Sequence, residues 1–170
     1  MTDSPTILVI TSKTFSLKAQ SWVHDDQATL LFDAQKTGVF SKDTQLNEIS
    51  TSETTILKDQ RWKPESPWLI ESTLGQFQIK RNIRSITRHY WIEGGVFDGA
   101  TVQADSPDYG YQIALGDRVI ANAYEKRLSL KSEQQVDMVE DTAETRLLAA
   151  IVGIVVSREK QEQRNNMQPS

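Results

Sequence analysis

The amino-acid sequence predicts a single, mainly β domain that closes around one hydrophobic α-helix near the C-terminus. Short segments of strand character recur along the chain, with turn residues between them at a spacing of roughly 8–12 residues. That spacing is typical of a sandwich or barrel. The segment Leu147–Val156 contains no polar residue. With 170 residues, the chain is long enough to bury one full core.

The N-terminal part predicts a strand followed by a hairpin. Ile7–Ile10 is apolar and β-branched, which favours a strand. Ser21–Phe32 has apolar ends and a polar centre at His24–Gln27. Aspartate side chains accept hydrogen bonds from the backbone two residues on, so this centre is predicted to be the hairpin turn.

The segment Val39–Pro67 is rich in Ser, Thr, Glu, Asp and Lys. Two interpretations remain open for it: poorly packed strands, or a long surface loop. In either case we expect Trp62 and Trp68 to anchor the segment onto the core, because large aromatic side chains favour burial.

The second half predicts further strands, since apolar or β-branched residues dominate short segments between turns. These segments are Phe77–Lys80, Arg88–Ile92, Val96–Val102, Tyr111–Ala114, Arg118–Ala121 and Val136–Val139. Tyr111–Ala114 and Arg118–Ala121 are predicted to pair across the turn Leu115–Asp117.

The C-terminal apolar segment is predicted to be a central helix over about 142–157. Asp141 or Thr142 can cap it, and Glu144 lies in the first turn. A helix that is apolar on every face must be surrounded, and ten residues are too few for a membrane span of ~20. The competing interpretation is a final strand, since Ile and Val favour strands. We expect one domain over 1–157 and a polar, frayed tail over 158–170.

Composition excludes several classes of function. The formal net charge of −4 opposes general affinity for nucleic acid or an anionic membrane, although local basic patches remain possible. The absence of cysteine excludes disulfides and cysteine-ligated metals. Met1–Pro5 lacks the basic and apolar regions of a secretory signal, so we expect a cytoplasmic location, with peripheral membrane association left open.

The candidate binding residues are Lys80, Arg84 and Arg88. No acidic residue occurs from Ser72 to Ile92, although the whole chain is negatively charged. On an extended strand the three cations share one face, and arginine can hold a phosphorylated headgroup through its fork of donors. The alternative is a solvated outer face of the barrel.

No group of residues meets the requirements of catalysis, and we expect no catalytic residue, cofactor or metal. His24, Asp25 and Asp26 are neighbours along the chain and are predicted to form a polar hairpin tip. The expected function is non-enzymatic binding or scaffolding. The alternatives are a barrel that carries a small apolar ligand and an enzyme of unrecognised type.

Several short motifs resemble those of the Tubby C-terminal-like superfamily, in its LURP-one-related branch. An arginine that follows an acidic residue ends the central helix of that branch; this chain has Arg158, but Ser157 in place of the acid. The motifs are Tyr90–Gly95, Phe97–Ala100, Tyr111–Ala114, Lys126–Leu130, Val136–Val139 and Leu147–Val152, together with Ser12–Lys18 and Trp22–Asp26. They cover most of the chain outside 39–75.

The resemblance implies a closed antiparallel barrel of about a dozen strands around the buried helix, with phospholipid scramblases as distant relatives. It also implies a partner class, because Tubby proteins hold phosphoinositide headgroups in a basic surface pocket. The expected partners are therefore a phosphoinositide or other anionic lipid headgroup, or a protein, without membrane spanning.

Overall fold

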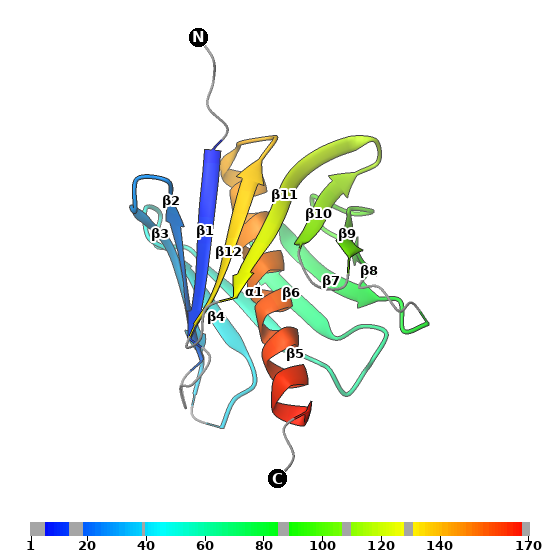
Figure 1. Cartoon of the computed structure of the whole chain (residues 1–170). Coiled ribbons are helices and arrows are strands. Elements are labelled where there is room, and N and C mark those ends of the chain that lie inside the picture. Colours follow the sequence, from blue (N-terminus) through cyan, green and yellow to red (C-terminus); the bar gives the residue numbers. More distant parts are fainter. Residues whose placement is uncertain are drawn as a thin grey trace.

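The computed structural model describes residues 6–13, 19–38, 40–84, 89–106, 110–127 and 131–167, with side chains left out at 105–106, 127, 131 and 163–167. The described residues form twelve antiparallel strands in a closed barrel, with a single helix, α1 (Ala143–Met167), running through it (Figure 1). The predicted fold class is confirmed.

Each strand pairs with the next along the chain, and β1 closes the barrel by pairing with β12, with Leu8 opposite Val136. The strands are β1 (Thr6–Lys13), β2 (Gln20–Asp25), β3 (Leu30–Lys36), β4 (Thr44–Glu48), β5 (Thr54–Asp59), β6 (Trp68–Ser72), β7 (Gly75–Arg81), β8 (His89–Glu93), β9 (Thr101–Ser106), β10 (Gly110–Leu115), β11 (Arg118–Arg127) and β12 (Lys131–Met138). Closure leaves no unpaired strand edge along the wall.

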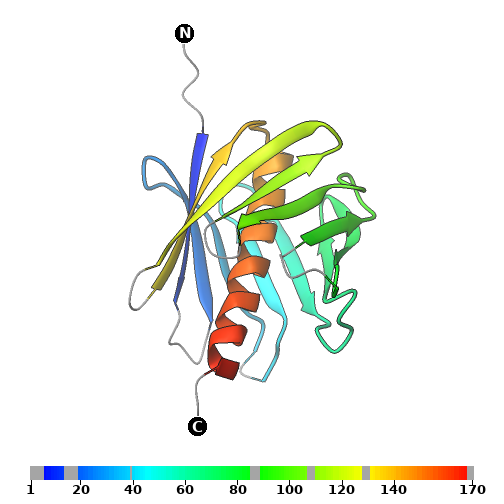
Figure 2. The ribbon, with the colours of Figure 1, turned by 45° about the vertical axis from the view of Figure 1, so that its right-hand side comes forward.

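The core lies between the inner face of the barrel and α1. Alternate residues of each strand point inward, as Leu8 and Ile10 do on β1, and they pack against Leu148, Ile151 and Ile154 of the helix. Figure 2 shows α1 (orange to red) between the blue strands on one side and the cyan and green strands on the other. The apolar segment is therefore a helix, and the strand interpretation is wrong.

The two predicted hairpins are confirmed. The β2–β3 turn is held by Asp25, whose Oδ1 accepts hydrogen bonds from the backbone N–H groups of Gln27 and Thr29, at 2.9 and 2.8 Å. β10 and β11 pair across the turn at Gly116. In contrast, the strand predicted over Val96–Val102 forms only from Thr101 onward, because Gly99 adopts a positive φ in a preceding turn.

The segment Val39–Pro67 contains β4 and β5, so strands rather than one long loop build much of it. These strands are well packed, since Leu46 and Leu57 are fully buried. Trp68 is buried as predicted. The prediction for Trp62 is wrong, because its side chain lies on the β5–β6 loop, exposed to solvent.

α1 begins as predicted and ends later. Thr142 caps the helix: its Oγ1 accepts from the N–H of Thr145 at 3.1 Å, and its own N–H donates to Thr145 Oγ1 at 2.8 Å. The frayed tail predicted over 158–170 is wrong for 158–167, because the helix continues to Met167 and both Arg158 and Glu159 are buried. Residues 168–170 lie outside the described residues. Glu159 accepts hydrogen bonds from the Trp68 indole, at 3.3 Å, and from the Tyr90 hydroxyl.

Candidate functional site

The candidate site lies at the end of the barrel where α1 leaves it. Because successive strands run in opposite directions, every second loop meets at this end (Figure 1). We call it the exit rim: residues 37–38 and 40–43 of the β3–β4 loop, 60–67 of the β5–β6 loop, 82–84 after β7, and 158–162 of α1.

Three neighbouring loops of the exit rim each carry a large exposed apolar side chain. The exposed fractions are 100% for Phe40, 75% for Trp62 and 54% for Ile83. Each of these residues is one or two positions from an exposed cation. Those cations are Lys42, Lys63 and Arg84. The Lys63 ammonium lies 4.7 Å from the centroid of the Trp62 ring.

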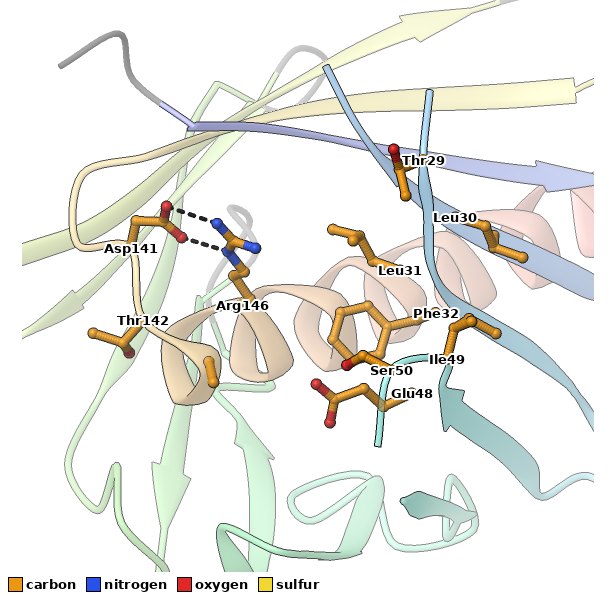
Figure 3. A pocket seen from close by; sticks show the side chains of 11 residues that line it. Thr29, Leu30, Leu31, Phe32, Glu48, Ile49, Ser50, Asp141, Thr142 and Arg146 are labelled. Carbon is orange, nitrogen blue, oxygen red and sulfur yellow. Dashed lines mark hydrogen bonds and ion pairs between the residues drawn. The ribbon is translucent and has the colours of Figure 1, made fainter. Parts of the chain in front are cut away.

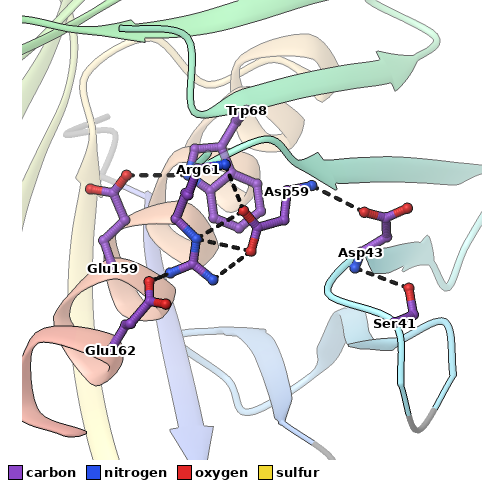
Figure 4. Close-up of polar contacts among 7 residues, drawn as sticks. All are labelled: Ser41, Asp43, Asp59, Arg61, Trp68, Glu159 and Glu162. Atoms are coloured by element: carbon purple, nitrogen blue, oxygen red, sulfur yellow. Dashed lines mark hydrogen bonds and ion pairs between the residues drawn. The ribbon is translucent and has the colours of Figure 1, made fainter. Parts of the chain in front are cut away.

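Beneath these loops, carboxylates and Arg61 form an ion-pair network. Arg61 Nε donates to both carboxylate oxygens of Asp59 at 2.9 Å, and Arg61 also pairs with Glu162 of α1 (Figure 4). The guanidinium carbon lies 5.3 Å from the centroid of the Trp68 ring. Burial lowers the pKa of Arg61, but Asp59 and Glu162 raise it by more, so the network keeps Arg61 charged.

Two small cavities open at the exit rim. One, of about 220 Å³, lies between Pro64, Pro67 and Arg81 beside Glu159. The other, of about 260 Å³, lies on the far side of Arg61 and reaches the buried Arg158. Its charged lining residues are Lys36, Lys42, Arg61, Arg158 and Glu162. We call this second cavity the basic cavity.

The opposite rim, where α1 begins, has the opposite charge. Its turns comprise residues 26–29, 49–53, 73–74, 94–100, 116–117 and 139–142. Exposed carboxylates occur on four of these turns, at Asp26, Glu53, Asp98 and Asp117. Arg118 is paired with Glu140 at 2.8 Å. Among the described residues of the exit rim, the exposed carboxylates are Glu65 and Glu162, and Glu162 is paired with Arg61. Against them stand the three exposed cations Lys42, Lys63 and Arg84, so charge is separated along the barrel axis.

A larger cavity, of about 430 Å³, lies at the opposite rim between β3, the β4–β5 turn and the start of α1 (Figure 3). Phe32 and Ile49 give it apolar walls. Its charged groups already have partners, since Arg146 is paired with Asp141 and Glu48 accepts from the Thr51 hydroxyl at 3.0 Å. Nothing in this cavity requires a charged ligand.

Two of the predicted binding residues, Lys80 and Arg84, do not share a strand face. Lys80 lies on β7 and is ion-paired with Glu93 at 3.0 Å. β7 ends at Arg81, so Arg84 lies beyond it, exposed on the exit rim. Arg88 lies outside the described residues.

Phe40, Lys42 and Trp62 belong to the candidate site but were not predicted for it. The sequence shows each apolar residue close to a cation. However, only the strand count and pairing show that their loops share one end of the barrel.

Among the residues that the structure describes, no group of three His, Asp or Glu side chains is arranged to hold a metal ion. Within the same residues, no helix combines the length and apolarity needed to cross a membrane.

Searches against models of protein families, curated proteins and solved structures found no match to this chain. The relationship to the Tubby C-terminal-like superfamily therefore stays a prediction, and the function must be argued from the site.

Proposed function

We propose that this protein is a non-enzymatic binding protein that attaches to an anionic lipid surface through its exit rim. The observation that carries the proposal is the repetition of one arrangement on three neighbouring loops. Each loop presents an exposed apolar side chain next to a cation.

The apolar component suits the interface of a bilayer. Single exposed apolar residues are ordinary, but Phe40, Trp62 and Ile83 project from the same end of the barrel. Tryptophan and phenylalanine favour the headgroup region, where an aromatic ring meets both acyl chains and water. The side chains of Phe40, Trp62 and Ile83 could enter that region without any change in the barrel.

The charged component supplies attraction and orientation. A cation near an anionic membrane contributes about 1 kcal/mol, so Lys42, Lys63 and Arg84 together contribute about 3 kcal/mol. The carboxylates of the opposite rim are repelled by the same surface. A protein with a net charge of −4 would therefore approach with its exit rim first.

The alternatives have less support. A carrier of apolar ligands needs an empty barrel, whereas α1 fills this one with Leu148, Ile151 and Ile154. An enzyme needs convergent polar groups around a reacting atom, and the ion-pair network of Arg61 leaves its carboxylates engaged. The predicted relationship to Tubby proteins makes phosphoinositides the first anionic lipids to test.

Vesicle flotation tests the proposal. Wild-type protein should float with vesicles that contain phosphatidylserine or a phosphoinositide, and not with pure phosphatidylcholine. The variant Lys42→Glu/Lys63→Glu/Arg84→Glu should lose at least about 3 kcal/mol, or roughly a hundredfold in partition coefficient. The variant Phe40→Ser/Trp62→Ser/Ile83→Ser should also lose binding, because its apolar tips are gone.

The matched control is Val96→Ser/Val139→Ser, which removes exposed apolar side chains from the opposite rim. It should float like the wild type. Equal flotation of all variants, or none by the wild type at low salt, would reject membrane attachment. If none of the proteins floats, but the wild type binds a protein partner that the exit-rim variants do not bind, the exit rim is a surface for protein recognition.

A further inference from the structure

Arg158 is a buried cation that forms no ion pair with a carboxylate in the part of the chain that the structure describes. Only 9% of its surface is exposed. Its Nη2 donates to the carbonyl oxygen of Ala19 at 3.1 Å, while its Nε has no hydrogen-bond partner among the described residues. The nearby Asp59 carboxylate is engaged by Arg61 instead.

A buried guanidinium that makes no ion pair is costly, because removal from water penalises the charged form, and the Asp59 carboxylate, which Arg61 engages, compensates only in part. Burial, together with the neighbouring Arg61, lowers the pKa of Arg158 to about 10. The side chain still carries its charge at neutral pH. A bound anion would supply the missing counter-charge.

The surroundings of Arg158 add further cations. The basic cavity brings Lys36 and Lys42 to the same space, and neither has an ion pair among the described residues. Its only lining carboxylate, within the described part of the chain, is Glu162, which is paired with Arg61. The cavity therefore holds an excess of positive charge.

The size of the cavity limits the ligand. A volume of about 260 Å³ is far more than a single water molecule needs, yet it lies below the range of about 300–1,000 Å³ usual for drug-sized ligands. A small, compact, multiply charged group matches both the volume and the donors. Arginine holds the oxygens of phosphate and sulfate through paired N–H donors, and lysine adds a point charge.

We propose that the basic cavity is a binding site for one small oxyanion of the phosphate or sulfate class, held by Arg158, Lys36 and Lys42. Its occupation by a free anion does not depend on membrane attachment. Its use for a phosphorylated lipid headgroup rests on the proposed function, because the cavity opens at the exit rim.

Calorimetric titration with inorganic phosphate, without lipid and at constant ionic strength, tests the site. The wild type should bind saturably with one site. Arg158→Met should weaken binding at least about tenfold, because it removes the paired donors. Lys63→Met alters the exit rim outside the cavity and should bind phosphate like the wild type.

Arg158→Met removes a buried charge but also the donor to the Ala19 carbonyl, so its melting temperature in phosphate-free buffer should change little. If that variant nevertheless fails to fold, Lys36→Met/Lys42→Met provides the same test with side chains nearer the surface. Absence of saturable binding by the wild type, or unchanged affinity in these variants, would overturn the site.

A second comparison separates the two sources of the anion. Vesicles that carry a phosphomonoester lipid should compete with free phosphate if the headgroup enters the cavity. If the wild type binds phosphate but does not float with vesicles, the cavity is a site for a free anion, and only the proposal of membrane attachment is rejected. Flotation that depends on Phe40, Trp62 and Ile83, with no phosphate binding, would overturn only the oxyanion site.

Discussion

At the scale of single residues, Gln134 joins the barrel wall to the helix within the core. Its Oε1 accepts from the Tyr111 hydroxyl at 2.7 Å, and its Nε2 donates to the Gly153 carbonyl at 3.0 Å and to Ser157 Oγ at 2.7 Å. Burial raises the pKa of Tyr111, so the hydroxyl remains a donor at neutral pH. The network fixes the position of α1 along the barrel axis.

Replacement of Gln134 by leucine should therefore destabilise the protein. The Tyr111 hydroxyl and Ser157 would lose buried partners, at a cost of about 1–3 kcal/mol for each unsatisfied group. Urea unfolding monitored by circular dichroism measures the change in the free energy of unfolding. Adding Tyr111→Phe to Gln134→Leu should restore part of the lost stability, because the Tyr111 hydroxyl that lacks a partner is then absent. An unchanged free energy of unfolding in Gln134→Leu alone would show that the network contributes little.

The burial of Gln134 could have been predicted from the sequence. It shares strand parity with Val136 and Met138, both of which point inward. The sequence does not show which side chains form hydrogen bonds with Gln134. Tyr111 belongs to β10, and Ser157 lies on the facing side of a helix, so their meeting depends on the complete barrel.

At the scale of elements, the beginning of α1 was predictable and its end was not. Thr142 and the acidic first turn are local signals, whereas Ser157–Lys160 is polar and suggests return to water. Arg, Glu, Lys and Gln favour helices, and no proline occurs between Ser157 and Pro169, so continuation of the helix was compatible with the sequence. Glu159 is buried where it accepts hydrogen bonds from Trp68 and Tyr90, which are distant in sequence.

The ion pair between Asp141 and Arg146, at the start of α1, predicts a pH dependence. Arg146 donates to Asp141, with Nη2 2.8 Å from Oδ2, and this bond, aided by Thr6, lowers the pKa of Asp141. A carboxyl whose pKa is lower in the folded state stabilises the protein above its unfolded pKa of about 3.9, and this stability is lost as pH falls through the folded pKa.

Between pH 5 and pH 2, the free energy of unfolding should therefore fall more steeply for the wild type than for Asp141→Asn. Urea titrations at both pH values provide the comparison. Parallel loss of stability in the two proteins would mean that the pair does not contribute to folding.

At the scale of the whole molecule, barrel and helix depend on each other. Ile151 lies at the centre of the core with none of its surface exposed. Ile151→Asp should unfold or aggregate the protein, because an unpaired carboxylate there costs several kcal/mol. Val96→Asp, the same kind of change at an exposed turn, should leave the melting temperature nearly unchanged. A soluble Ile151→Asp variant with cooperative unfolding would show that the helix is dispensable for the core.

The architecture was predictable to a larger extent than the candidate site. The segment Leu147–Val156 is apolar throughout, so a helix there must be surrounded by protein, and the short predicted strands can form the surrounding sheet. The class of fold therefore followed from local patterns. The site depends on which loops share an end of the barrel. Lys80 and Arg84 are close in sequence, but Lys80 lies on the barrel wall and Arg84 on the exit rim, because β7 ends between them. Phe40 and Ile83 are distant in sequence but lie on the same rim.

The closing strand β12 and the helix α1 follow one another directly along the chain. The ribosome synthesises them after all the other strands. The barrel therefore cannot close until β12 is available, and its core cannot form until α1 is available. Until then β1 has only β2 beside it, and the inward apolar side chains face water or chaperones. Folding should therefore follow synthesis of α1, and a ribosome stalled before residue 143 should hold an open, protease-sensitive sheet.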